Sequence, residues 1–217
     1  MAPNSFSFLL FLRVLRGSLV SLWVPAAALV GEPLDFFAYC PGMSETTQPY
    51  AGLTPDVILN AVDSTGLRTD GRLLALNSYE NRVYQVGIED GKPLIAKFYR
   101  PARWTDAQIL EEHAFTAELA AREIPAVPAL VTGNTTLHAF AGFRFALYPR
   151  RGGRAPELDD PDTLEWLGRF IGRIHAVGAI APFVHRPALD IAGFGEEPRS
   201  YLLGSNWIPA DLRQAYS

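Results

Sequence analysis

Cysteine is nearly absent from this 217-residue chain, which contains Cys40 and no other cysteine. A single cysteine excludes an internal disulfide bond and a cysteine-based metal site. The four histidines show neither an HExxH pattern nor another metal-ligand spacing. The sequence also lacks a strong basic run, and its formal net charge is -4. This charge pattern argues against a large nucleic-acid interface.

An unbroken apolar stretch long enough to span a membrane is missing as well. Residues 6–12 and 19–30 are apolar, but two arginines and a glycine separate them, whereas a spanning helix needs about 20 consecutive apolar residues. No Lys or Arg precedes the first stretch, as a signal peptide would require. We interpret residues 1–42 as an extension from a misplaced start and expect the native chain to begin at Met43. A weak signal or membrane anchor is the alternative.

The composition allows a folded core, because 48% of the residues are hydrophobic and 19% are charged. The length fits one large domain or two small lobes. Within residues 83–98, two segments rich in β-branched and aromatic residues flank an Asp-Gly pair, which predicts a β-hairpin. Side chains alternate along a strand, so Ile95, Lys97 and Tyr99 are expected on one face. An isolated lysine there is most often an edge-strand residue that prevents aggregation.

Capping residues predict three helices. Thr54 begins a helix that ends at Gly66, and Thr105 opens a second with a capping box that runs to residue 122. Asp160 caps a third, amphipathic helix that Gly178 closes. We expect residues 179–208 to be irregular and a last helix to start at residue 209. The remaining strands are expected at residues 72–76, 127–132, 136–140 and 143–148.

The order of these features suits phosphate transfer. A polar turn before a hairpin can cover phosphate oxygens with backbone N–H groups. A strand lysine supplies a point charge, and a helix carboxylate can fix its rotamer. In this sequence the turn, Lys97 and the adjacent Glu111 and Glu112 follow one another in that order.

Several long strings match one family in order and spacing. They are LNSYENRVYQV, LIAKFYRPARWT, QILEEHAF, GRFIGRIHAVG and HRPALDI. From residue 53 onward the chain resembles the stress response kinase A group, which are bacterial Ser/Thr protein kinases with the aminoglycoside phosphotransferase and choline kinase fold. The resemblance implies an α+β, protein-kinase-like fold. An antiparallel-sheet N-lobe with one inserted helix is expected at residues 43–149, and a linker with an incomplete helical C-lobe at 150–217.

The resemblance also implies residue roles. Lys97 resembles the strand lysine that pairs with the ATP phosphates, and Glu112 its helix partner. We prefer Glu112 to Glu111 because it aligns with the helix pattern of the family, and adjacent helix residues point about 100° apart. Ser78 resembles the ATP contact in the covering turn. Residues 146–148 resemble the hinge whose backbone would contact adenine, and Ile95 would line the adenine pocket. The implied ATP-binding residues are therefore Ser78, Ile95, Lys97, Glu112, Ala146 and Tyr148.

The sequence departs from the family in two respects. The covering turn has no G-x-G-x-x-G pattern, and no H-x-D-x-x-x-x-N string occurs in the chain. In the family, the catalytic aspartate and the Mg-binding residues lie downstream of the point that matches Ser217. We therefore expect no catalytic or metal-binding residue here, and an N-terminal kinase fragment with little or no turnover. The implied cofactors are ATP and Mg²⁺, and the implied acceptor is a protein Ser/Thr hydroxyl.

Two other functions stay open. The chain could be a non-catalytic nucleotide- or partner-binding fragment, or a kinase that acts on a small-molecule hydroxyl, because a fold does not fix the acceptor. We expect a cytoplasmic monomer that binds no nucleic acid and, unless residues 1–42 are native, no membrane. His113 is interpreted as a surface or half-buried residue. The arginines of residues 150–154 are interpreted as a solvated connector between the lobes.

Overall fold

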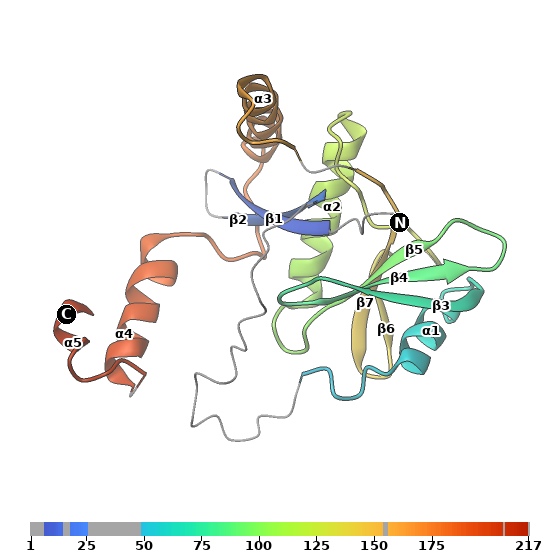
Figure 1. The fold of residues 1–217 in the computed structure, drawn as a ribbon, viewed down its shortest axis with the longest axis horizontal. Coiled ribbons are helices and arrows are strands. Elements are labelled where there is room, and N and C mark those ends of the chain that lie inside the picture. Colours follow the sequence, from blue (N-terminus) through green and yellow to red (C-terminus); the bar gives the residue numbers. More distant parts are fainter. Residues whose placement is uncertain (1–6, 15–17, 26–48, 154–155, 206, 217) are drawn as a thin grey trace.

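The chain is built around one five-stranded antiparallel sheet, seen in the computed structural model in Figure 1. The structure describes residues 7–14, 18–25, 49–153, 156–205 and 207–216. The strand order is β3-β4-β5-β7-β6, so β5 is the central strand. The five strands are β3 (Thr69–Leu76), β4 (Arg82–Ile88), β5 (Leu94–Phe98), β6 (His138–Phe140) and β7 (Phe143–Pro149).

The predicted hairpin is confirmed as β4 and β5, which pair antiparallel. Two helices lie on opposite faces of the sheet: α1 (Pro55–Asp63) on one and α2 (Asp106–Ala121) on the other. Along the chain, α2 follows β5 and precedes β6 and β7, although β5 and β7 are neighbours in the sheet. This order confirms that one helix is inserted into the sheet sequence.

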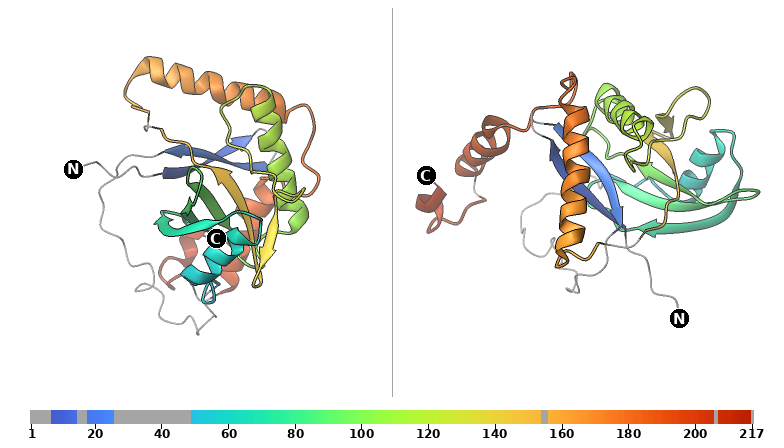
Figure 2. Two further views of the ribbon diagram at one scale, coloured as in Figure 1. Left: turned by 90° about the vertical axis from the view of Figure 1, so that its right-hand side faces the viewer. Right: turned by 90° about the horizontal axis from the view of Figure 1, so that it is seen from above.

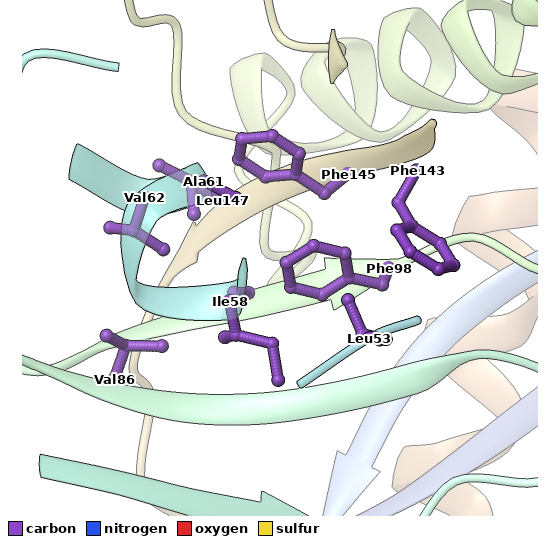
Figure 3. Close-up of a cluster of buried hydrophobic side chains, with 10 residues drawn as sticks. Leu53, Ile58, Ala61, Val62, Val86, Phe98, Phe143, Phe145 and Leu147 are labelled. Carbon is purple, nitrogen blue, oxygen red and sulfur yellow. The ribbon is translucent and has the colours of Figure 1, made fainter. Parts of the chain in front are cut away.

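The main core lies between α1 and the sheet, as Figure 3 shows. Phe98 is fully buried there, and its ring stacks on Phe145 with the centroids 5.2 Å apart. Ala96 is on the same face, whereas Ile95 and Lys97 face α2, as strand alternation predicts. The buried members are Leu53, Ile58, Ala61, Val62, Val86, Ala96, Phe98, Phe143, Phe145 and Leu147.

Both predicted caps of the first two helices are present. Thr54 accepts a hydrogen bond from the Val57 N–H, and Thr105 forms a complete capping box with Gln108. The predicted end of α1 is wrong, because the helix stops at Asp63, whereas Gly66 adopts its left-handed φ of 89° in the following turn. Serine and threonine hydroxyls just after the helix donate to carbonyls of its last turn and so help to end it early.

Two strand predictions are also wrong. The first strand begins at Thr69 rather than at residue 72. Residues 127–132 form no strand and carry an isolated bridge from Thr132 to Thr135 and a hydrogen bond from Leu130 N–H to the Leu147 carbonyl. Pro128 has no N–H to donate, which disfavours a regular ladder in this segment.

The C-terminal part differs from the sequence prediction more than the sheet does. Helix α3 (Pro161–Gly178) has the expected Asp160 cap, and Arg150 and Arg151 are exposed as predicted. Residues 192–204, expected to be irregular, form η2 (Ala192–Glu196) and α4 (Glu197–Gly204). A proline in the first turn suits α4, because its fixed φ matches a helix start. The last helix, α5 (Arg213–Tyr216), starts later than predicted.

Two parts of the chain do not join the five-stranded sheet. Strands β1 (Ser7–Val14) and β2 (Ser18–Pro25) form a separate antiparallel pair, and Figure 2 shows α4 and α5 away from the five-stranded sheet. Among the described ranges, no helix has the length and apolar character needed to cross a membrane. The predicted start at Met43 and the connector residue Arg154 lie outside the described residues. The lobe boundary between residues 149 and 150 stays a prediction.

Candidate functional site

Lys97 on β5 and Glu112 on α2 form a buried ion pair. Lys97 Nζ donates to Glu112 Oε1 over 3.0 Å, and the two side chains are only 9% and 6% exposed. Charges removed from water to this extent need a close partner, because burial alone is costly. The prediction that Lys97 pairs with Glu112 rather than with Glu111 is confirmed.

Both members of this pair are held in their charged forms. Burial lowers the pKa of Lys97, but the charge and hydrogen bond of Glu112 outweigh it, so the pKa lies above the ordinary lysine value. Burial likewise raises the pKa of Glu112, and the charges of Lys97 and Arg186 reverse this effect, so its pKa lies below the ordinary value. The site therefore holds a fixed ammonium group at neutral pH.

Arg186 is a third member of the site that sequence analysis missed. Its guanidinium donates to Glu112 Oε2, and its Nε donates to the Gln108 carbonyl over 3.1 Å. The Arg186 side chain is buried and lies over the Trp104 ring, 4.6 Å from its centroid. A signal was available, because Arg186 belongs to the HRPALDI string, which lies outside every predicted element.

Glu111 binds a backbone segment instead of a side chain. Its carboxylate accepts hydrogen bonds from the N–H groups of Val184, His185 and Arg186, at 2.5, 3.0 and 2.8 Å. Burial raises the pKa of Glu111, but these backbone bonds outweigh it and lower the pKa overall. The two adjacent glutamates thus hold two different parts of the chain, as their divergence on a helix requires.

The residues expected around adenine share the face of the sheet that carries Lys97. Ile95 is the cross-strand partner of Tyr148, and Lys97 is the partner of Ala146. Residues directly opposite each other in an antiparallel pair point to the same face. Strand register therefore brings these four residues together, and Glu112 reaches the same side from α2. Their roles toward a nucleotide stay predictions.

Ser78 lies in the turn at residues 77–81 that joins β3 to β4, and its side chain is half-buried. The turn is fixed by hydrogen bonds that its own side chains accept. Glu80 Oε1 accepts from Trp104 Nε1 over 2.7 Å, and Asn81 Oδ1 accepts from the Arg100 N–H over 3.2 Å. Because β4 begins next to the Lys97 end of β5, the turn lies at the same end of the sheet. Contact between Ser78 and a nucleotide stays a prediction.

His113 is buried, so the interpretation as a surface or half-buried residue is wrong. Its Nε2 lies 2.7 Å from the Tyr99 hydroxyl, and its Nδ1 lies 2.8 Å from Thr136 Oγ1. The Tyr148 hydroxyl is 3.2 Å from that of Tyr99. Burial lowers the pKa of His113 to about 4, so the ring is neutral at pH 7. This network joins α2 to the strand expected to form the hinge.

The described part of the chain contains no group of three or more His, Cys, Asp or Glu side chains that could hold a metal ion. The described side chains therefore offer no cluster of this kind for the Mg²⁺ ion that is expected with a kinase. The candidate site described above consists of the Lys97 ammonium, the Glu112 carboxylate and the Arg186 guanidinium.

Comparison with known proteins identifies the family. Residues 72–214 match the phosphotransferase enzyme family. The chain belongs to this family. It is 42% identical over 175 residues to stress response kinase A of Escherichia coli (strain K12), a match that covers 80% of this chain and 53% of that protein. It is 39% identical over 174 residues, with the same coverage, to the serine/threonine protein kinase RdoA of Salmonella typhimurium (strain LT2).

The resemblance to the stress response kinase A group is thereby confirmed. The chain spans about half the length of these relatives. The fold of this phosphotransferase family member is also similar to that of the amicoumacin kinase hAmiN, solved in complex with AMP-PNP, Ca²⁺ and Ami. That match has a TM-score of 0.55 and 23% identity, and it covers 72% of this chain and 49% of the kinase. It confirms the α+β, protein-kinase-like fold.

Proposed function

We propose that this chain is the nucleotide-binding part of an ATP-dependent Ser/Thr protein kinase of the stress-response type. The buried Lys97–Glu112 ion pair carries the proposal. Phosphoryl transfer depends on positioning and charge neutralisation, and a strand lysine fixed by a helix carboxylate supplies both. A buried ion pair by itself is weak evidence for a role in stability or in function. The family match supports a functional role for this pair.

The site residues act on different parts of ATP. Lys97 offers its remaining donor directions to the phosphates, while Glu112 keeps the ammonium in place. The turn that carries Ser78 covers phosphate oxygens with its backbone N–H groups. Ile95 and Ala146, both buried on the Lys97 face, form the apolar surface against the adenine ring.

A protein hydroxyl is the proposed acceptor, and the names of the similar stress response and Ser/Thr kinases support it. The similarity to the amicoumacin kinase concerns the fold alone. A small-molecule acceptor is therefore an alternative that experiment decides. We propose Mg²⁺ as the accompanying ion of the whole kinase. We assign none of the site residues named above as its ligand. A cytoplasmic, monomeric state completes the proposal.

We further propose that the 217-residue chain binds ATP but transfers phosphate slowly or not at all, because it contains no H-x-D-x-x-x-x-N string. The alternative of a purely nucleotide-binding or partner-binding protein makes the same prediction for this chain. The two differ for the whole protein, in which only the kinase hypothesis expects transfer to a hydroxyl.

Titration calorimetry with ATP and Mg²⁺ tests the proposal on the 217-residue chain. Lys92 is exposed in the β4–β5 turn and is the other lysine of the sequence, so Lys92→Met is a matched control for Lys97→Met. We expect ATP to bind the wild type and Lys92→Met alike, and Lys97→Met at least about 30-fold more weakly, which is about 2 kcal/mol. Equal binding by all three proteins would refute the assigned role of Lys97.

A further inference from the structure

Arg186 connects two parts of the candidate site. Its guanidinium binds the Oε2 atom of Glu112 and stacks over Trp104. Trp104 in turn donates its Nε1–H to Glu80, which belongs to the turn at residues 77–81. A single arginine therefore contacts both the carboxylate of the ion pair and the aromatic ring that holds the turn.

We propose that Arg186 is a positioning residue of the nucleotide site, which fixes the carboxylate of Glu112 so that its other oxygen stays directed at Lys97. The inference rests on the proposed function and deepens it. A carboxylate bound through one oxygen can still rotate, whereas both oxygens of Glu112 are occupied by cations from distant segments of the chain. A guanidinium suits this task because its planar fork is rigid and stacks on an aromatic ring.

The backbone around Arg186 is itself held against α2. Glu111 accepts the N–H groups of residues 184–186, and Gln108 Nε2 donates to the His185 carbonyl over 3.0 Å. Gln108 also accepts the Arg186 Nε–H through its backbone carbonyl. The segment thus contacts two consecutive turns of α2 through both backbone and side chain. Glu111 anchors this segment, and the anchored segment delivers the guanidinium to Glu112.

A purely structural ion pair would stabilise the fold without controlling Lys97, so the test needs a direct readout of the ammonium group. The chain has two lysines, and protein labelled with ¹⁵N-lysine therefore gives two side-chain signals, which the Lys92→Met variant assigns. Hydrogen exchange of the Lys97 ammonium with water, measured by NMR, reports how firmly Glu112 holds it.

The variants are Arg186→Gln, Arg186→Lys and Glu111→Gln, with Arg169→Gln as the control. Arg169 pairs with Glu165 on α3, where both side chains are exposed. We expect Arg186→Gln to bind ATP about tenfold more weakly and to exchange its Lys97 ammonium about tenfold faster. Arg186→Lys keeps the charge, is expected to fold, and should fall between Arg186→Gln and the wild type. Glu111→Gln should weaken ATP binding about threefold, and Arg169→Gln should match the wild type.

The inference is overturned if Arg186→Gln and Arg186→Lys both keep the wild-type ATP affinity and the wild-type exchange rate of Lys97. Failure of the proposed function gives a different result, in which neither the wild type nor Arg169→Gln binds ATP. In that case the exchange rates still decide whether Arg186 positions Glu112, because they require no nucleotide.

Discussion

Glu111 and Glu112 are neighbours in α2, yet they bind different parts of the chain. Glu112 pairs with the Lys97 ammonium and the Arg186 guanidinium, whereas Glu111 accepts three backbone N–H groups of the segment that carries Arg186. The helix therefore ties the central strand of the sheet to a segment that follows α3. Loss of either carboxylate has consequences that can be separated by experiment.

The central ion cluster predicts an asymmetry in stability. Lys97→Met leaves Glu112 paired with Arg186, so we expect the free energy of unfolding to fall by about 1–3 kcal/mol. Glu112→Gln removes the carboxylate that both cations share, and we expect a loss of about 3–5 kcal/mol. Urea denaturation of the two variants measures the difference. Equal losses would show that Arg186 does not share the Glu112 charge.

The buried His113 predicts a pH dependence of stability. The unfolded chain takes up a proton on this residue below its ordinary pKa of 6.5, whereas the folded chain resists protonation until about pH 4. The unfolded state therefore binds more protons between these values, and stability falls as the pH is lowered from 6.5 to 4. Integration over this window gives about 3 kcal/mol.

The variant His113→Gln removes this titration. Unfolding free energies of the wild type and the variant, measured by urea denaturation from pH 7 to pH 4, should converge as the pH falls. Carboxylates titrate in the same range, but they are common to both proteins and cancel in the comparison. Parallel pH profiles would contradict a neutral, buried histidine.

The capping box of α2 predicts a cost for loss of one hydroxyl. Thr105 Oγ1 accepts the Gln108 N–H, so Thr105→Ala leaves an unpaired donor at the helix start. We expect the free energy of unfolding to fall by about 1 kcal/mol, and Thr105→Ser, which keeps the acceptor, to remain close to the wild type. Thermal unfolding of the two variants provides the measurement. A Thr105→Ser variant as unstable as Thr105→Ala would assign the effect to the lost methyl group.

The core on the α1 face predicts a large effect of aromatic truncation. Phe98 is fully buried against Phe145, and Phe98→Ala should cost about 3–5 kcal/mol because the cavity cannot close completely. Tyr79 is 95% exposed, so Tyr79→Ala should change stability by less than about 0.5 kcal/mol. Chemical denaturation compares them. Similar small effects would mean that the face against α1 is loosely packed.

Local patterns predicted the β4–β5 hairpin and the start of α2 well. The Asp-Gly hairpin, the alternation around Lys97 and the Thr105 capping box depend on residues close in sequence, and all three are present. The choice of Glu112 over Glu111 came from the resemblance to the family. The hairpin, the strand alternation and the capping box are set by short-range chemistry, which a single sequence displays.

Features that depend on distant segments were not predicted. Helix α2 buries the polar residues Glu112, His113 and Thr116, so a search for an apolar stripe could not identify its inner face. Arg186 lies 74 residues from Glu112 in sequence, and no periodicity connects them. The helix at residues 197–204 has no buried residue and therefore no apolar stripe that periodicity could detect.

The most direct test of the central claim asks which lysine lies beside the phosphates of a bound nucleotide. An acyl-phosphate derivative of ATP transfers its acyl group to an amine beside the phosphates, and mass spectrometry identifies the modified residue. The account predicts that Lys97 is modified, that Lys92 is not, and that an excess of ATP prevents the reaction. Modification of Lys92 alone, or modification of Lys97 that ATP does not suppress, would contradict a phosphate-binding role for the Lys97–Glu112 pair.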